Sequence, residues 1–160
     1  MTPYRQAATL LRQFAQPGSS GLDYVCGVGH FLQALKAEGF KPYGVEFDAP
    51  AANDAAATVG CSVLTVAYFD RDCGGQAFDV IHLGDVLEHL PDPAATLAGL
   101  LKRLKPGGYL FVEGPLETNP SPVYWSARLF GGAKHRLRPA LRARMLLHIF
   151  LMDYHFTMIH

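Results

Sequence analysis

The sequence predicts an α/β domain built around a doubly wound, mainly parallel sheet. Short apolar runs alternate with segments whose apolar residues recur at helical spacing, from about residue 20 to residue 115. Gly27 and Gly29 form a turn between the first such run and the helix that follows it. Hydrophobic residues make up 49% of the 160 residues, which is enough for one sizeable core. We therefore expect one domain over residues 1–160, with its core in residues 20–115 and a lid, a basic helix and a tail in residues 116–160.

The first half of the chain begins with a helix, and strands and helices then alternate. The expected elements are a helix over residues 4–14, a strand over 22–25, a helix over 30–38, a strand over 41–48 and a helix over 49–58. Asp48 is expected to cap the last of these helices, with Pro50 in its first turn.

The same alternation continues until Pro115 and then stops. Strands are expected over 61–66, 77–83 and 109–113, with a helix starting near Asp85 and another over 93–104 that Lys105-Pro-Gly-Gly108 ends. Beyond Pro115 we expect a loop over 117–122, a helix over 123–130 and a basic amphipathic helix over 136–147. Residues 149–160 are ambiguous between helix and strand, and the sheet-forming residues in 154–159 favour a strand there.

Composition favours a cytoplasmic protein that does not bind nucleic acid. The formal net charge is zero, so no overall field attracts nucleic acid or an anionic membrane. The three cysteines, Cys26, Cys61 and Cys73, lack the spacing of a metal site and are expected to be reduced. No signal peptide or membrane-spanning run is apparent. The basic run over 134–144 is a solvated helix face or, alternatively, a site for an acidic acceptor or an anionic membrane surface.

A ligand site is expected at the edge of the sheet where the strands end. In an open parallel sheet, ligands bind at the carboxyl ends of the strands, near the point where the strand order reverses. This edge would bring together the glycine turn, Glu46 and the loops after Val66 and Leu83. A carboxylate at position 46 can accept hydrogen bonds from both hydroxyls of a ribose, and Phe47 could lie against an adenine. The alternative is an ordinary strand–helix turn with no ligand.

Three blocks of sequence together resemble class I S-adenosylmethionine-dependent methyltransferases. They are Leu22-Asp-Tyr-Val-Cys-Gly-Val-Gly29, Val86-Leu-Glu-His-Leu-Pro-Asp-Pro93 and Leu104-Lys-Pro-Gly-Gly108, within a match that covers about residues 20–115. The resemblance implies a Rossmann-like sheet of order 3-2-1-4-5, S-adenosylmethionine as cofactor and a small-molecule acceptor. It leaves the acceptor unidentified.

The resemblance also implies roles for residues around the glycine turn. Asp23 would hold the amino group of the methionine moiety. The backbone of Cys26, Gly27 and Gly29 would line the methionine and ribose, and Glu46 would take the ribose hydroxyls. Packing is the favoured role for the Cys26 side chain, and a nucleophilic role is the less favoured alternative.

Further roles fall on the later loops. Phe47 would pack on the adenine, and Phe69 and Asp70 would belong to the loop along the adenine edge. Gly84 and Asp85 would close the pocket beside the methionine moiety. His89 is an acid–base candidate, with the plain start of a helix as its alternative, and no metal site is predicted.

Two features depart from the family pattern. Val25 replaces the first glycine of the turn, where a positive φ would strain a β-branched residue. The tail is short, so we expect the final antiparallel strands to be reduced or incomplete, and an open sheet edge could support a homo-oligomer. The alternative function is therefore a non-catalytic scaffold or shortened remnant that binds a partner. A nicotinamide dehydrogenase ranks last, because the turn lacks the third small residue of that fingerprint.

Overall fold

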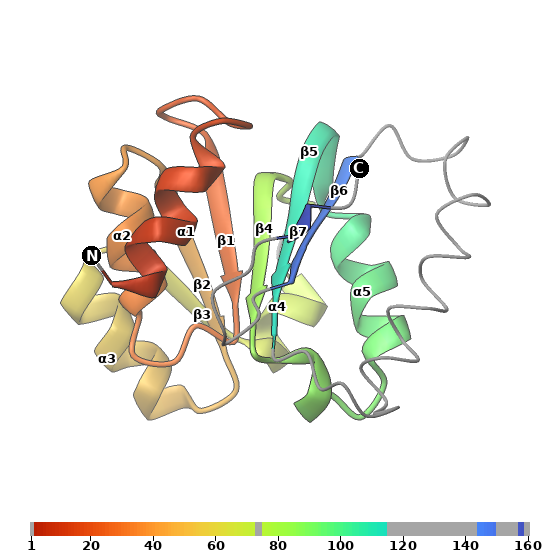
Figure 1. Cartoon of the computed structure of the whole chain (residues 1–160). Coiled ribbons are helices and arrows are strands. Elements are labelled where there is room, and N and C mark those ends of the chain that lie inside the picture. The colour runs from red at the N-terminus through yellow and green to blue at the C-terminus, as the bar shows by residue number, and fades with distance from the viewer. Residues whose placement is uncertain (1, 73–74, 115–143, 150–156, 159–160) are drawn as a thin grey trace.

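A sheet of seven strands in the order β3-β2-β1-β4-β5-β6-β7 forms the centre of the molecule (Figure 1). The computed structural model describes residues 2–72, 75–114, 144–149 and 157–158, the last two segments as backbone only. The strands are β1 (Ser20–Tyr24), β2 (Lys41–Glu46), β3 (Ser62–Thr65), β4 (Phe78–Gly84), β5 (Leu104–Glu113), β6 (Arg144–Ile149) and β7 (Thr157–Met158). The helices are α1 (Pro3–Leu11), α2 (His30–Ala37), α3 (Ala49–Val59), α4 (Val66–Asp72), η1 (Leu87–His89, a 3₁₀ turn) and α5 (Pro93–Leu101).

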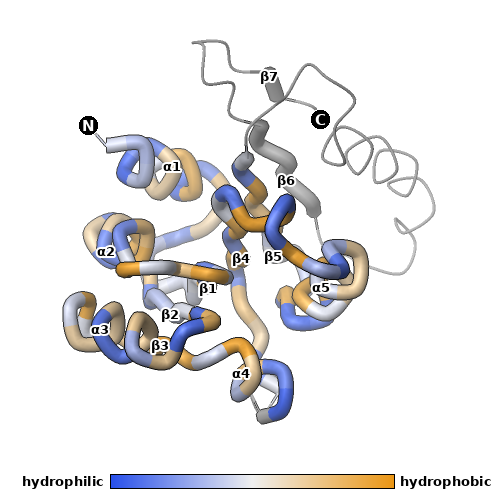
Figure 2. The backbone as a smooth tube through the Cα atoms, turned by 90° about the horizontal axis from the view of Figure 1, so that it is seen from below, coloured by the Kyte–Doolittle hydropathy of each residue, from blue (hydrophilic) through white to orange (hydrophobic). Residues whose placement is uncertain are grey.

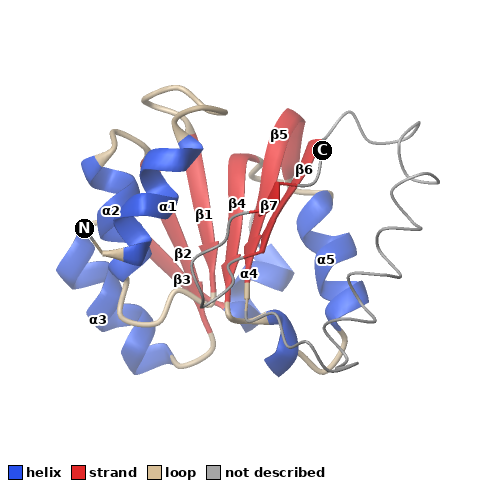
Figure 3. Cartoon of the chain, viewed as in Figure 1, coloured by secondary structure: helices blue, strands red, loops and turns tan. Residues whose placement is uncertain are grey.

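The first five strands are all parallel, which confirms the predicted order 3-2-1-4-5. β6 runs parallel to β5, and β7 runs antiparallel to β6. Helices cover both faces of this sheet: α1, α2 and α3 lie on one face, and α4 and α5 on the other (Figures 2 and 3). Crossover helices on both faces are the usual way in which parallel strands are shielded from water.

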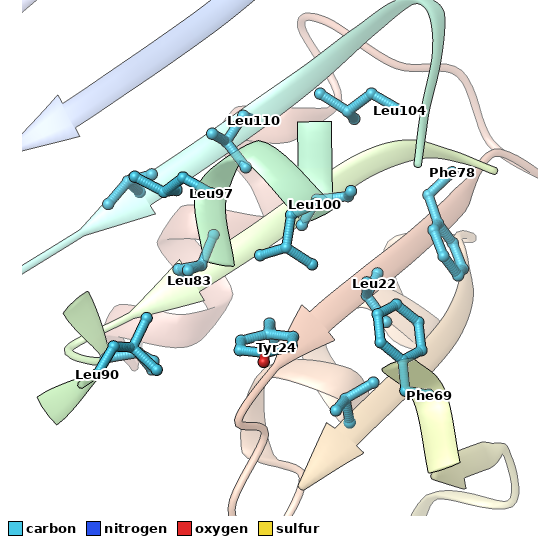
Figure 4. Packing of buried hydrophobic residues seen from close by; sticks show 14 residues of the cluster. Leu22, Tyr24, Phe69, Phe78, Leu83, Leu90, Leu97, Leu100, Leu104 and Leu110 are labelled. Carbon is cyan, nitrogen blue, oxygen red and sulfur yellow. The ribbon is translucent and has the colours of Figure 1, made fainter. Parts of the chain in front are cut away.

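Each face of the sheet has its own apolar core. Between the sheet and α4 and α5, the strands contribute Leu22, Tyr24, Phe78 and Leu83, and α5 contributes Leu97 and Leu100 (Figure 4). On the opposite face, Phe31 and Leu35 of α2 pack with Val80 and Phe111. From Val80 to Leu83, the residues of β4 alternate between the two faces, as the period of a strand requires, whereas Phe78 precedes a register shift in the strand.

The start of α3 follows from local sequence as predicted, whereas two later helices are shorter than predicted. Asp48 accepts a hydrogen bond from the amide of Ala51 at 3.0 Å and caps α3, with Pro50 in the first turn. The helix predicted near Asp85 is only the short η1, and α5 ends at Leu101 instead of Leu104.

Residues 105–108 bulge out of β5 instead of separating a helix from a strand. Phe78 pairs with Leu104 and Val80 with Tyr109, so an advance of two residues along β4 corresponds to an advance of five along β5. Gly107 has a φ of 83°, and a Cβ on Gly108 would lie 2.9 Å from the carbonyl oxygen of Asp79. The two glycines of the Lys-Pro-Gly-Gly block therefore permit the bulge.

Two further expectations are corrected by the structure. The segment after Thr65 is the helix α4 and not a loop. Residues 144–147, predicted to end a basic helix, form the first part of β6 and pair in parallel with residues 109–112. Pairing with β5 satisfies backbone groups that an edge strand would leave open, and this gain outweighs a weak helical preference. Residues 115–143, with the predicted loop and lid helix, lie outside the described residues, and 157–158 is the described part of the predicted strand over 154–159.

Candidate functional site

The turn after β1 lies beside the end of β2 and has an unusual backbone. Val25, Gly27 and Gly29 all have positive φ, at 66°, 54° and 84°. The Cys26 amide donates to the carbonyl of Val45 at 2.9 Å, which ties the turn to β2. Position 25 therefore does need the left-handed conformation that a β-branched residue disfavours. The Val25 side chain is half-buried and packs against the core beneath α4 and α5.

The two glycines of the turn serve different purposes. A Cβ on Gly29 would lie 2.8 Å from Cγ2 of Val59, so this glycine allows α2 and α3 to pack closely. A Cβ on Gly27 would meet nothing within 4 Å among the described residues. The backbone at Gly27 therefore borders open space, where a ligand could come close to it.

Glu46 points its carboxylate at this turn. Its Oε2 accepts from the Gly27 amide at 2.7 Å, and its Oε1 accepts from the Phe47 amide at 2.6 Å. The residue is buried, whereas the neighbouring Phe47 is 55% exposed at the same edge of the sheet. The carboxylate is thus held in one orientation beside the open space over Gly27, and an exposed aromatic ring lies next to it.

Asp23 lies beneath the turn in a buried chain of charged groups. Its Oδ1 lies 2.7 Å from Nδ1 of His82, whose Nε2 lies 3.0 Å from Oε2 of Glu113. β1, β4 and β5 each supply one member, because Asp23 pairs with His82 across one strand pair and Gly84 pairs with Glu113 across the other. We call this set the Asp23–His82–Glu113 chain.

His82 is held as a cation by its two neighbours. Burial by itself lowers the pKa of an imidazole, but the charge and hydrogen bond of Asp23, and then those of Glu113, raise the pKa of His82 to about 9. The Phe31 ring lies against the imidazole with 3.8 Å between centroids. A Cβ on Gly84 would lie 2.8 Å from the Cε1 of His82. Gly84, predicted to border the methionine moiety, thus leaves room for this imidazole.

Sequence reasoning missed His82 and Glu113. The available signal was the period of β4, in which His82 lies on the same buried face as Val80. A histidine at such a position is paired in most structures, and its partners could be sought at the ends of neighbouring strands. Which strands are neighbours is known only once the sheet order is fixed.

The structure places Phe69 and Asp70, predicted to follow the adenine edge, on the helix α4. Phe69 is buried in the core, and the guanidinium carbon of Arg103 lies 4.4 Å above its ring. Asp70 lines a cleft of about 790 Å³ between α4 and α5. Burial, and then the charge of Asp70, raises the pKa of Tyr24, which also lines this cleft. The exposed aromatic residue of this segment is Tyr68, at 46%.

The remaining candidates lie at the end of β4 and in the turn. Asp85 is exposed, has a φ of 52° and donates its amide to the carbonyl of Glu113 at 3.0 Å. His89 is exposed in η1 and has no side-chain hydrogen bond to another described residue.

Cys26 is buried, and burial followed by the charges of Asp23 and Glu46 raises its pKa to about 12. Its thiol is therefore protonated at neutral pH, which favours packing over nucleophilic chemistry.

The described residues contain no cluster that could hold a metal ion, and no described helix is long and apolar enough to cross a membrane.

Comparison with known proteins gives consistent matches. A family model described as a methyltransferase domain matches residues 2–157. The chain is 28% identical over 144 residues to the ubiquinone biosynthesis O-methyltransferase of Sodalis glossinidius, covering 86% of this chain and 56% of that protein. It is 33% identical over 102 residues to the protein of the same name from Methylococcus capsulatus, covering 59% of this chain and 42% of that protein. The chain thus spans about half the length of these curated relatives.

Solved structures share the fold at lower identity. The sugar N-methyltransferase KedS8 from Streptoalloteichus superposes with a TM-score of 0.62 at 19% identity, over 74% of this chain and 49% of that one. The amino pentose methyltransferase CalS10 from Micromonospora echinaspora, solved with S-adenosylmethionine bound, gives a TM-score of 0.61 at 22% identity, over 69% of this chain and 49% of that one.

Proposed function

This chain belongs to the methyltransferase domain family, and on that premise we propose that it binds S-adenosylmethionine and methylates a small-molecule acceptor. The observation that carries the proposal is the Glu46 carboxylate, fixed by the Gly27 and Phe47 amides beside the open space over Gly27. Each carboxylate oxygen has a further lone pair, so Glu46 could accept the ribose hydroxyls without giving up these amides.

An unpaired oxygen of Asp23 supports the proposal that this residue binds the amino group of the cofactor's methionine moiety. Its Oδ1 is bonded to His82, whereas its Oδ2 has no hydrogen-bond partner among residues 2–72 and 75–114, although the residue is only 3% exposed. A buried carboxylate oxygen without a donor is costly, and the ammonium of the methionine moiety would satisfy it.

The other residues would shape the site around these two acids. The exposed Phe47 ring would lie against the adenine, and the backbone of Cys26, Gly27 and Gly29 would border the ribose and methionine. Asp85 and Gly84 would lie at the methionine end. When bound, S-adenosylmethionine supplies a methyl group activated by a positively charged sulfur. The acidic side chains Asp23 and Glu46 suit such a cation, and the protein's contribution to catalysis would be mainly to position the acceptor.

The acceptor atom is proposed to be an oxygen, nitrogen or carbon. His89 is proposed as a base in case the acceptor must lose a proton, because its exposed imidazole is unpaired within the described residues and follows β4 at the same edge. We also propose that the protein acts in the cytoplasm and does not bind nucleic acid, in line with its zero formal net charge.

Glu46→Gln tests the proposed cofactor site. The amide keeps the shape but loses the charge and one acceptor, so S-adenosylhomocysteine should bind about tenfold or more weakly in titration calorimetry. Glu38→Gln is the matched control, because Glu38 lies at the far end of α2, bonded to Thr9 and Arg12. Failure of the wild-type protein to bind at millimolar concentration would overturn the proposal, as would an unchanged affinity in Glu46→Gln.

A second candidate function is a scaffold that no longer catalyses and binds a partner protein or a second copy of itself. Two observations favour it: the left-handed Val25, and β3 as an edge strand of the sheet. A stable oligomer in light scattering, together with no measurable affinity for S-adenosylhomocysteine, would favour the scaffold over the enzyme.

A further inference from the structure

The Asp23–His82–Glu113 chain places the His82 ring between the buried carboxylate of Asp23 and the partly buried carboxylate of Glu113. His82 is 2% exposed and Asp23 is 3% exposed, so neither is surrounded by bulk water. Among the described residues, the charged groups that face the imidazole are Asp23 from β1 and Glu113 from β5. α2 contributes the Phe31 ring to the environment of His82, and β5 contributes the Phe111 ring.

We propose that His82 is a positioning residue for the cofactor, which holds Oδ1 of Asp23 and so leaves Oδ2 free for the cofactor's amino group. This inference rests on the proposed function, because it assumes that Asp23 takes that amino group. It assigns to His82 a role in binding that touches no ligand atom and acts only through Asp23.

The charge of His82 strengthens its bond to Asp23. Because the pKa of His82 is raised to about 9, the 2.7 Å bond between Nδ1 and Oδ1 joins a cation to a carboxylate. Charge-assisted hydrogen bonds of this kind are about twice as strong as neutral ones. A neutral side chain at position 82 would therefore hold the Asp23 carboxylate less firmly.

The two hydrogen bonds of His82 also fix the orientation of its ring. Both ring nitrogens are engaged, so the imidazole cannot rotate without breaking a bond to Asp23 or to Glu113. The Phe31 ring and the close approach to Gly84 hold the ring plane from the sides. The bond from Nδ1 therefore fixes Oδ1 of Asp23, and the remaining oxygen is left for a ligand.

His82→Gln separates this role from simple structural support. The amide can still donate one hydrogen bond, but it carries no charge. We expect S-adenosylhomocysteine to bind at least tenfold more weakly than to wild type in titration calorimetry. Methylthioadenosine, which lacks the amino group, should bind within threefold of its wild-type affinity. A loss of packing alone would weaken the binding of both compounds, and that outcome would overturn the proposal.

Asp79→Asn is the matched control. Asp79 also connects β4 to β1, through the amide and hydroxyl of Ser20 at 2.7 and 2.8 Å, and it pairs with Lys105. Asp79 and Ser20 lie at the starts of β4 and β1, whereas His82 and Asp23 lie nearer the ends of these strands. The Asp79→Asn variant should therefore have a lower thermal stability and an unchanged affinity for S-adenosylhomocysteine. Equal loss of affinity in both variants would overturn the proposal.

A measurement on the wild-type protein tests the proposal even if the His82→Gln variant does not fold. Nitrogen and Cε1 chemical shifts of His82 should show a doubly protonated ring at pH 7.5, in the absence of any ligand. A neutral ring would overturn the inference whatever the cofactor does. Wild type that has the protonated ring but binds no S-adenosylhomocysteine would overturn the proposed function instead, and with it the role of His82.

Discussion

Val25 is the residue at which the turn after β1 departs most from ordinary backbone. A φ of 66° costs a β-branched residue about 1–3 kcal/mol. The side chain recovers part of this cost, because it is half-buried against the core beneath α4 and α5. Backbone strain and side-chain burial at position 25 thus act on stability with opposite signs. The affinity for a ligand is therefore a more informative measure of the turn than the stability of a Val25 variant.

Val25→Gly is expected to bind S-adenosylhomocysteine more tightly than wild type, by about threefold or more in titration calorimetry. Glycine would allow the backbone to adjust to a ligand at a position where valine restricts it. Val25→Ala is the control, since it removes the branched side chain but keeps the Cβ that disfavours positive φ. Equal gains in both variants would point to bulk alone, and equal or weaker binding in Val25→Gly would contradict the prediction.

At the scale of the elements, the close packing of α2 on β2 positions the turn. A Cβ on Gly44 in β2 would lie 2.8 Å from Cδ1 of Leu32 and 2.9 Å from the sulfur of Cys26. The absence of a side chain at position 44 therefore lets α2 pack down on the sheet, and it holds Cys26 and the turn beside Glu46. Gly99 in α5 is the opposite case, because a Cβ there would meet nothing within 4 Å.

Gly44→Ala and Gly99→Ala should therefore change stability in opposite directions. Overpacking at position 44 should lower the free energy of unfolding by about 1–3 kcal/mol. In the interior of α5, alanine should raise it by about 0.5–1 kcal/mol, because glycine loses more conformational freedom on folding. Urea unfolding of the two variants measures both effects, and a Gly44→Ala variant as stable as wild type would contradict the packing argument.

For the molecule as a whole, the buried His82 couples stability to pH. The pKa of His82 is raised from 6.5 to about 9 by Asp23 and Glu113, so the folded state holds a proton that the unfolded chain releases near pH 6.5. Its contribution to stability is fully present below pH 6.5 and is lost as the pH rises towards 9.

The free energy of unfolding should therefore fall between pH 6.5 and pH 9 by up to roughly 3 kcal/mol. Urea titrations at intervals across this range would measure the slope. His82→Gln should remove most of the slope, because it carries no titrating group at that position. A wild-type protein whose stability is constant over this range, or rises, would show that His82 is not held as a cation.

The features around the turn that the sequence alone indicates are local in origin. Glu46 is the last residue of β2, so its position depends only on where that strand ends. Asp48 caps α3 by accepting a hydrogen bond from an amide three residues further along the chain. Phe69 lies on α4, where the sequence predicts a loop, and the core side of this short helix buries its ring. Propensity over so few residues is a weak guide, and tertiary packing decides such segments.

The order of strands and helices, the glycine turn and the position of Glu46 were determined by the sequence itself, because hydrophobic period, capping residues and glycine act over a few neighbouring residues. The link from His82 to Asp23 and Glu113 was decided only by the tertiary structure. These residues lie 59 and 31 positions apart in the chain and meet because the sheet places β1 and β5 on either side of β4. The parallel pairing of β6 with β5 was decided in the same way, since the need to satisfy an open strand edge arises only once the sheet has formed.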